Sequence, residues 1–103
     1  MPQKALGLIE VRGLVTAIGA ADAALKAANV RLIGYETAKG SGGMVLIKIE
    51  GEVEAVNAAV EAARARAEQI REVIGVQVIP RPAQGLAKLV RSAETVGLSC
   101  AEP

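Results

Sequence analysis

Apolar residues recur along the chain with two different spacings, and the change between them marks the expected elements. Four short stretches are dominated by apolar residues over six or seven positions, which predicts β-strands. In two longer stretches apolar residues return every three or four positions, which predicts amphipathic helices. The expected strands are residues 5–11, 30–35, 44–50 and 74–79, and the expected helices are residues 14–28, 52–70 and a short one at 86–90.

The order of these elements, β-α-β-β-α-β, restricts the possible folds. With right-handed crossovers it is a ferredoxin-like split βαβ unit, an α/β arrangement of the α+β type. In that fold an antiparallel sheet carries both helices on one face. The sequence therefore predicts one layer of helices on one layer of sheet.

Each of the two long helices is expected to have one apolar face. In residues 14–28 apolar residues repeat at spacings of three and four on one helical face, and in residues 52–70 an apolar stripe runs parallel to a polar one. Gly19 weakens the first helix by about 1 kcal/mol relative to alanine, which hints at close packing there. Asn29 is expected to end that helix as its C-terminal cap. The predicted faces are Leu14, Ile18, Ala21, Leu25 and Ala28 in the first helix and Val53, Val56, Val60, Ala63, Ala67 and Ile70 in the second.

The sheet face without helices also carries apolar residues. Leu6 and Leu8 point away from the face that holds Ile9 and Val11, and Leu32 and Leu46 need burial too. An apolar sheet face that no helix covers implies cover from loops or from a partner.

Composition narrows the class of protein. The 103 residues suffice for one domain, expected at residues 1–91, followed by a flexible C-terminal tail at residues 92–103. There is one aromatic residue, Tyr35, and the formal net charge is +1, which disfavours nucleic-acid binding. The single cysteine, Cys100, fits a reducing cytosol. No run of about 18 apolar residues exists, so a membrane is not an expected partner.

The candidate chemistry is sparse. The chain has no histidine, so the usual catalytic triads cannot form, and we expect no catalytic residues. No cluster of histidine or cysteine predicts a metal site, and no cofactor is expected. The glycine-rich stretch at residues 37–43 lacks the order of a P-loop, because its lysine precedes the glycines and a strand follows. That stretch is either a plain hairpin turn or a functional loop.

Several motifs together resemble a known family. In this order the chain contains ALGLIEVRG, AADAALKAANV, LIGYE, a GSG loop and VIPRP. Together they are similar to the single-domain, hexamer-forming type of bacterial microcompartment shell protein. The similarity covers about residues 1–90.

This resemblance implies a structural function and roles for particular residues. Members of the family form homohexamers that tile with neighbouring shell hexamers and other shell proteins into a shell, which encloses enzymes in the bacterial cytoplasm. Small metabolites cross through a central pore. The implied pore-lining residues are Lys39, Gly40, Ser41 and Gly42, and those implied at the edge between hexamers are Lys26, Asn29 and Arg81.

The chain departs from the family pattern in two places. Gly43 follows the GSG motif, and the segment from Tyr35 to Gly51 is two residues longer than usual. After IPRP many members have a histidine, whereas this chain has Ala83 and Gln84. The alternative function is a small oligomeric ligand-sensing module of ferredoxin-like fold, because one fold can serve many functions.

Overall fold

The computed structural model describes residues 4–37, 40, 42–91 and 95–96, and it confirms the expected order of elements. The elements in chain order are β1 (Ala5–Arg12), α1 (Leu14–Ala27), β2 (Arg31–Thr37), β3 (Met44–Gly51), α2 (Val53–Ile70), β4 (Val73–Ile79), the 3-10 helix η1 (Gln84–Leu86) and α3 (Ala87–Val90).

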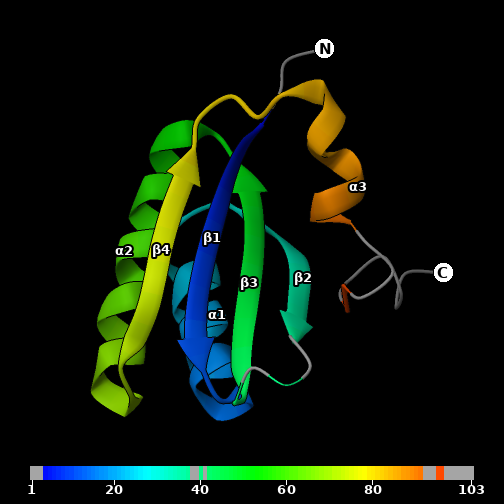
Figure 1. The fold of residues 1–103 in the computed structure, drawn as a ribbon. Helices are drawn as coiled ribbons and strands as arrows, with labels where there is room; N and C mark the ends of the chain where they lie inside the picture. Colours follow the sequence, from blue (N-terminus) through cyan, green and yellow to red (C-terminus); the bar gives the residue numbers. More distant parts are fainter. Residues whose placement is uncertain (1–3, 38–39, 41, 92–94, 97–103) are drawn as a thin grey trace, which may run out of the picture.

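The four strands form one antiparallel sheet in the order β2-β3-β1-β4. Helices α1 and α2 cover one face, and α3 lies on the other face near β2 and β3 (Figure 1). This is the predicted ferredoxin-like arrangement, with the addition of a small helix on the face that was expected to carry none.

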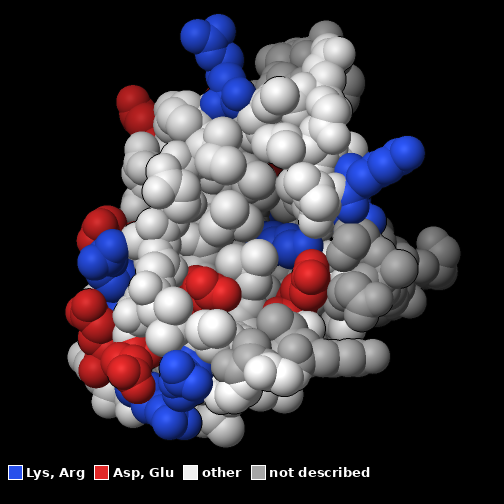
Figure 2. Space-filling view, in the orientation of Figure 1, with Lys and Arg blue, Asp and Glu red and all other residues white. Residues whose placement is uncertain are grey.

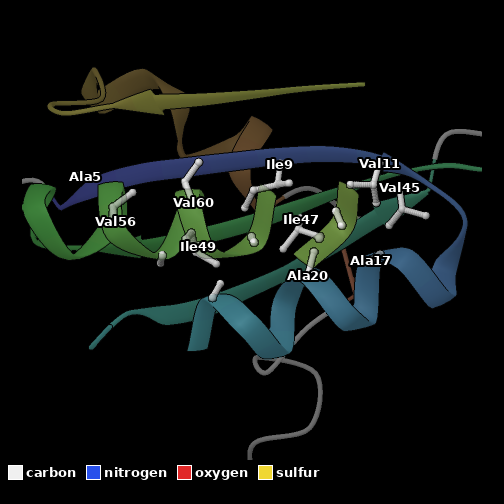
Figure 3. Packing of buried hydrophobic residues seen from close by; sticks show 14 residues of the cluster. Ala5, Ile9, Val11, Ala17, Ala20, Val45, Ile47, Ile49, Val56 and Val60 are labelled. Carbon is white, nitrogen blue, oxygen red and sulfur yellow. The ribbon is translucent and has the colours of Figure 1, made fainter. Parts of the chain in front are cut away.

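The core lies between the sheet and the two long helices. Its sheet side consists of β-branched residues together with Ala5, and its helix side is mainly alanine with two valines (Figure 3). Small helix residues let the helices approach the strands closely. The labelled members include Ile9, Val11, Val45, Ile47 and Ile49 from the strands and Ala17, Ala20, Val56 and Val60 from the helices.

Two glycines show how close this approach is. A Cβ atom on Gly7 would lie 2.8 Å from Cγ1 of Ile49 and 2.9 Å from Cγ1 of Val56. A Cβ atom on Gly19 would lie 2.8 Å from Cδ1 of Ile70, across the contact between α1 and α2. The close packing suggested by Gly19 is therefore confirmed.

The prediction of which face of α1 is buried is wrong. Helix α1 buries Thr16, Ala17, Ala20 and Ala24. Three of the large residues that were expected inside are 43–62% exposed: Leu14, Ile18 and Leu25. The helix is apolar on most sides, and the face of small residues gives the closer contact with the sheet and α2.

The predicted face of α2 is confirmed in its middle. Val56, Val60, Ala63 and Ala67 are buried together with Ala59. The terminal residues Val53 and Ile70 are 40% and 36% exposed, because they lie at the ends of the helix.

The predicted cap at Asn29 is wrong. Helix α1 ends at Ala27, and Ala28 follows in an extended conformation with φ −156°. No described residue other than glycine has a positive φ, so Asn29 does not adopt the left-handed conformation of a C-terminal cap. The extended backbone at Ala28 leads directly towards β2.

Candidate pore loop, candidate rim residues and a buried lysine

The two groups of predicted site residues lie at opposite ends of the sheet. Strand pairing aligns Arg12 of β1 with Met44, the first residue of β3, so the β2–β3 loop lies at the Arg12 end. At the other end Leu6 pairs with Ile79, and Pro80 and Arg81 follow directly. Strand β1 has eight residues, and at about 3.3 Å per residue its ends are separated by roughly 25 Å.

Helix α1 brings the other two rim residues to the Arg81 end. It starts at Leu14, beside the loop end, and finishes at Ala27. Lys26 therefore lies in its last turn, and Asn29 precedes β2. The structure thus brings Lys26, Asn29 and Arg81 to one end of the molecule and the glycine loop to the other.

The described part of the glycine loop has a backbone that favours glycine. Gly40, Gly42 and Gly43 have φ values of 75°, 76° and 89°, which residues with a side chain rarely adopt. Apart from the two residues next to each glycine in the chain, no described residue has an atom within 4 Å of where a Cβ atom on Gly40 or Gly43 would lie. Lys39 and Ser41, the other two predicted pore residues, lie outside the described residues.

The loop is anchored to the turn between β1 and α1. The amide of Gly13 donates a hydrogen bond of 2.7 Å to the carbonyl oxygen of Gly43. The Nη1 atom of Arg12 donates one of 3.0 Å to the carbonyl oxygen of Gly42. Gly13 itself has φ 92° and stands directly before α1. These bonds fix the C-terminal end of the loop to the rigid sheet.

The predicted rim residues are exposed. Lys26 forms an ion pair of 3.0 Å with Asp22, one helical turn earlier, and the two side chains are 76% and 59% exposed. This ion pair contributes little to stability, because both partners remain in water. Asn29 and Arg81 are also exposed, and Arg81 is flanked by Pro80 and Pro82.

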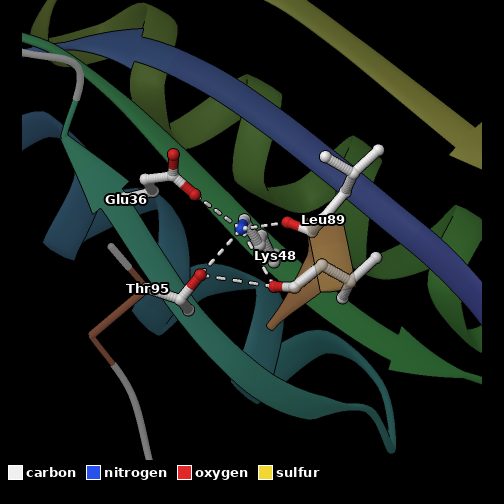
Figure 4. A network of polar contacts seen from close by, with 5 residues as sticks. Glu36, Lys48, Leu89 and Thr95 are labelled. Atoms are coloured by element: carbon white, nitrogen blue, oxygen red, sulfur yellow. Dashed lines mark hydrogen bonds and ion pairs between the residues drawn. The ribbon is translucent and has the colours of Figure 1, made fainter. Parts of the chain in front are cut away.

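Lys48 is a site that sequence reasoning missed. It lies on β3 between the core residues Ile47 and Ile49, on the opposite face, and its side chain is only 2% exposed. Its Nζ donates to Oε1 of Glu36 at 2.8 Å and to Oγ1 of Thr95 at 2.8 Å. It also donates to the carbonyl oxygens of Leu89 and Val90 at 3.1 and 2.9 Å (Figure 4).

The sequence of β3 did not predict that Lys48 is buried. Apolar and polar residues alternate around it, and such an alternation normally indicates that the polar face is solvated. Lysine is almost never fully buried unless it is paired. The pairing comes from β2 and from residues more than 40 positions later in the chain. Such a contact is set by the fold and not by local pattern.

The described residues offer little else that could perform chemistry. Within them no three histidine, cysteine, aspartate or glutamate side chains gather as metal ligands. Over the same ranges no helix has both the length and the apolar character that crossing a membrane requires.

Comparison with known proteins identifies the family to which this chain belongs. The BMC domain family matches residues 5–82. The bacterial microcompartment shell protein PduA of Citrobacter freundii is 48% identical over 90 residues, which are 87% of this chain and 95% of that protein. The shell protein EutM of Escherichia coli K12 is 47% identical over 79 residues, 77% of this chain and 79% of that protein. The major carboxysome shell protein CsoS1 of Prochlorococcus marinus is 44% identical over 90% of this chain and 89% of that protein.

A solved structure of a microcompartment protein has the same fold. The crystal structure of a microcompartment protein from Desulfitobacterium hafniense matches with a TM-score of 0.75 and 29% identity, covering 93% of this chain and 51% of that chain. Fold and matches together define a structural shell protein and not an enzyme. The chain belongs to the BMC domain family, that of the bacterial microcompartment shell proteins, as its motifs predicted.

Proposed function

We propose that this protein forms cyclic homohexamers that tile into the shell of a bacterial microcompartment, with a central pore for small metabolites. The observation that carries the proposal is the placement of the glycine loop and the rim residues at opposite ends of one sheet. A subunit with these two ends can point one towards a symmetry axis and the other towards neighbouring rings. Neighbouring hexamers, other shell proteins and enclosed enzymes are then its partners, in the bacterial cytoplasm.

The loop suits a position at the axis. Lys39, Gly40, Ser41 and Gly42 are the proposed pore-lining residues. No described residue beyond its immediate neighbours would contact a Cβ atom on Gly40, so the backbones of other copies can approach this position closely. Outward-facing amides and hydroxyls can replace part of the hydration of a small solute as it passes.

The surface of α1 suits contact with another copy. Leu14, Val15 and Ile18 are 45%, 77% and 62% exposed. Exposed apolar patches of this kind mark interaction sites. In a cyclic assembly each subunit presents two different surfaces to its neighbours, so a patch on one is covered by the next.

The rim residues suit contacts between rings. Lys26 can lay its methylene stem along a flat partner surface while its ammonium group stays in water. Arg81 is held between two prolines that restrict its backbone. Its planar guanidinium group can then donate to carbonyl oxygens of an adjacent ring. Asn29 belongs to the same proposed rim.

Substitution of Lys26 tests the tiling. If the stem of Lys26 is buried between rings, Lys26→Ala removes roughly 2 kcal/mol per contact, at about 0.8 kcal/mol per buried methylene. Lys26→Asp also adds a repulsive charge. We expect both variants to keep the hexamer, measured by light scattering, and to lose the sheets or tubes that the parent forms at high concentration in negative-stain images.

Asp22→Asn is the matched control, because it breaks the ion pair with Lys26 and leaves the lysine in place. It should tile as the parent does. Sheets formed equally well by Lys26→Asp would show that Lys26 is not at the rim. The known relatives described above are all named as shell proteins, which favours this function over a ligand-sensing module.

A further inference from the structure

One buried cation contacts the C-terminal segment, which is defined here as residues 84–91 with 95 and 96. Lys48 donates to the carbonyl oxygens of Leu89 and Val90 at the end of α3. Terminal carbonyl groups of a helix carry partial negative charge and are stabilised by a cation. Helix α3 has only four residues, so it cannot be stable by itself. Its position on the sheet therefore depends on such contacts.

Two further polar contacts hold the same segment. Nη2 of Arg91 donates to Oε2 of Glu50 at 3.1 Å. Val96 forms a β-bridge with Tyr35, through backbone hydrogen bonds of 2.7 and 2.8 Å. Thr95 and Val96 belong to the part of the chain predicted as a tail, yet they lie against β2.

The segment covers apolar residues on the sheet face opposite α1 and α2. Leu6 and Ile33 are each 5% exposed. They line a cavity of about 550 Å³ whose other wall includes Leu86, Val90 and Arg91. Farther along the same face, beside a smaller hollow, Leu8 and Leu46 are only half-buried. Figure 2 looks onto this face and shows mostly uncharged side chains, with charged side chains at the margins and a few acidic and basic ones near the centre.

A buried charge is an unusual means of fixing the C-terminal segment to the sheet. Burying an ion pair carries a desolvation cost, and a well-packed apolar residue of similar volume would often stabilise the fold as well or better. Lys48 has bonds to three separate parts of the chain, namely β2, the end of α3 and Thr95. Contacts to three separate parts of the chain favour one docked position of the segment over others.

We propose that Lys48 and Glu36 form a latch that holds the C-terminal segment closed over the sheet, and that the segment opens as a unit without unfolding the core. Opening exposes Leu6 and Ile33 beside Leu8 and Leu46, so the latch controls how much apolar surface this face presents. Native proteins open locally in such cooperative units. All the contacts involved lie within one chain, so the inference does not depend on the proposed hexamer.

Hydrogen exchange measured by mass spectrometry tests the latch. In Lys48→Met, a change that keeps the length and removes the charge, exchange should rise by about tenfold or more in peptides covering residues 86–96 and at the Tyr35 amide, because hydrogen bonds from a charged donor are lost. Peptides from the central strand β1 around Ile9 should exchange as in the parent. Lys88→Met is the matched control, since it makes the same change at an exposed position of α3, and it should alter nothing.

Glu36→Gln provides a second variant in case Lys48→Met fails to fold, because Glu36 is 31% exposed and its replacement leaves Lys48 with its other acceptors. It should raise exchange in the same peptides by a smaller factor. The proposal is overturned if the folded variants exchange like the parent over residues 86–96. It is also overturned if exchange rises equally in the core strands, which would mean global destabilisation.

Discussion

At the scale of single residues, glycines in similar strands have very different surroundings. Gly7 lies under α2, where an added Cβ would meet three side chains at 2.8–3.0 Å. Gly75 lies in β4, where an added Cβ would meet nothing within 4 Å. The sequence shows both as glycines within predicted strands, and only the packing of α2 distinguishes them.

This difference predicts opposite outcomes for the same substitution. Gly7→Ala should lower the free energy of unfolding by about 1–3 kcal/mol, because overpacking forces side chains and backbone to shift. Gly75→Ala should leave it within about 0.5 kcal/mol, as is usual for surface changes. Chemical denaturation at one fixed protein concentration measures both. Equal destabilisation by the two variants would contradict the packing described for Gly7.

Lys48 shows where residue-level prediction from sequence ends. A single lysine between isoleucines is normally interpreted as a solvent-facing position. The candidate residues of the glycine loop and the rim could be identified only because whole motifs resemble a family. The partners of Lys48 come from β2 and from the C-terminal segment. No local spacing contains that information.

At the scale of elements, prediction succeeded where one face of a helix is clearly more apolar. Helix α2 has a polar stripe from Glu54 to Arg71 opposite its valines and alanines, so its buried face could be identified. Helix α1 is apolar on two faces, and the buried face was predicted wrongly because the larger apolar residues were expected to lie inside. Its alanine face gives close contact with the sheet, which a periodicity of large residues cannot show.

The exposed face of α1 yields a prediction about assembly. Ile18 is 62% exposed in one chain, so Ile18→Asp should barely change the stability of the subunit. If a second copy covers this face, burying the new carboxylate without a partner costs several kcal/mol. We expect Ile18→Asp to dissociate the ring into smaller folded species, as judged by light scattering and circular dichroism.

Asn57→Asp is the control for that variant. Asn57 is exposed on α2 and lies on its polar stripe, so the added charge should leave the ring intact. A full-sized ring in the Ile18→Asp variant would mean that the apolar face of α1 is not an interface between subunits.

At the scale of the whole molecule, the sheet connects two ends for which we propose different roles. The antiparallel sheet with both long helices on one face (Figure 1) followed from the element pattern. The segment that covers the other face of the sheet could not be predicted, because the apolar residues on that face indicated only that something covers them. The structure places the protein's own C-terminal segment over Leu6 and Ile33, while Leu8 and Leu46 remain half-buried.

The central claim is that these subunits close into a six-membered ring with their glycine loops at the axis. Electron cryo-microscopy of the purified particle tests it most directly, because it gives both the number of subunits and the position of each loop. We predict a ring of six copies of the 10.5 kDa chain, with Gly40 and Gly42 around a central opening and Lys26 at the outer edge. A well-dispersed monomer, or a ring with the glycine loops at its outer edge, would contradict the account.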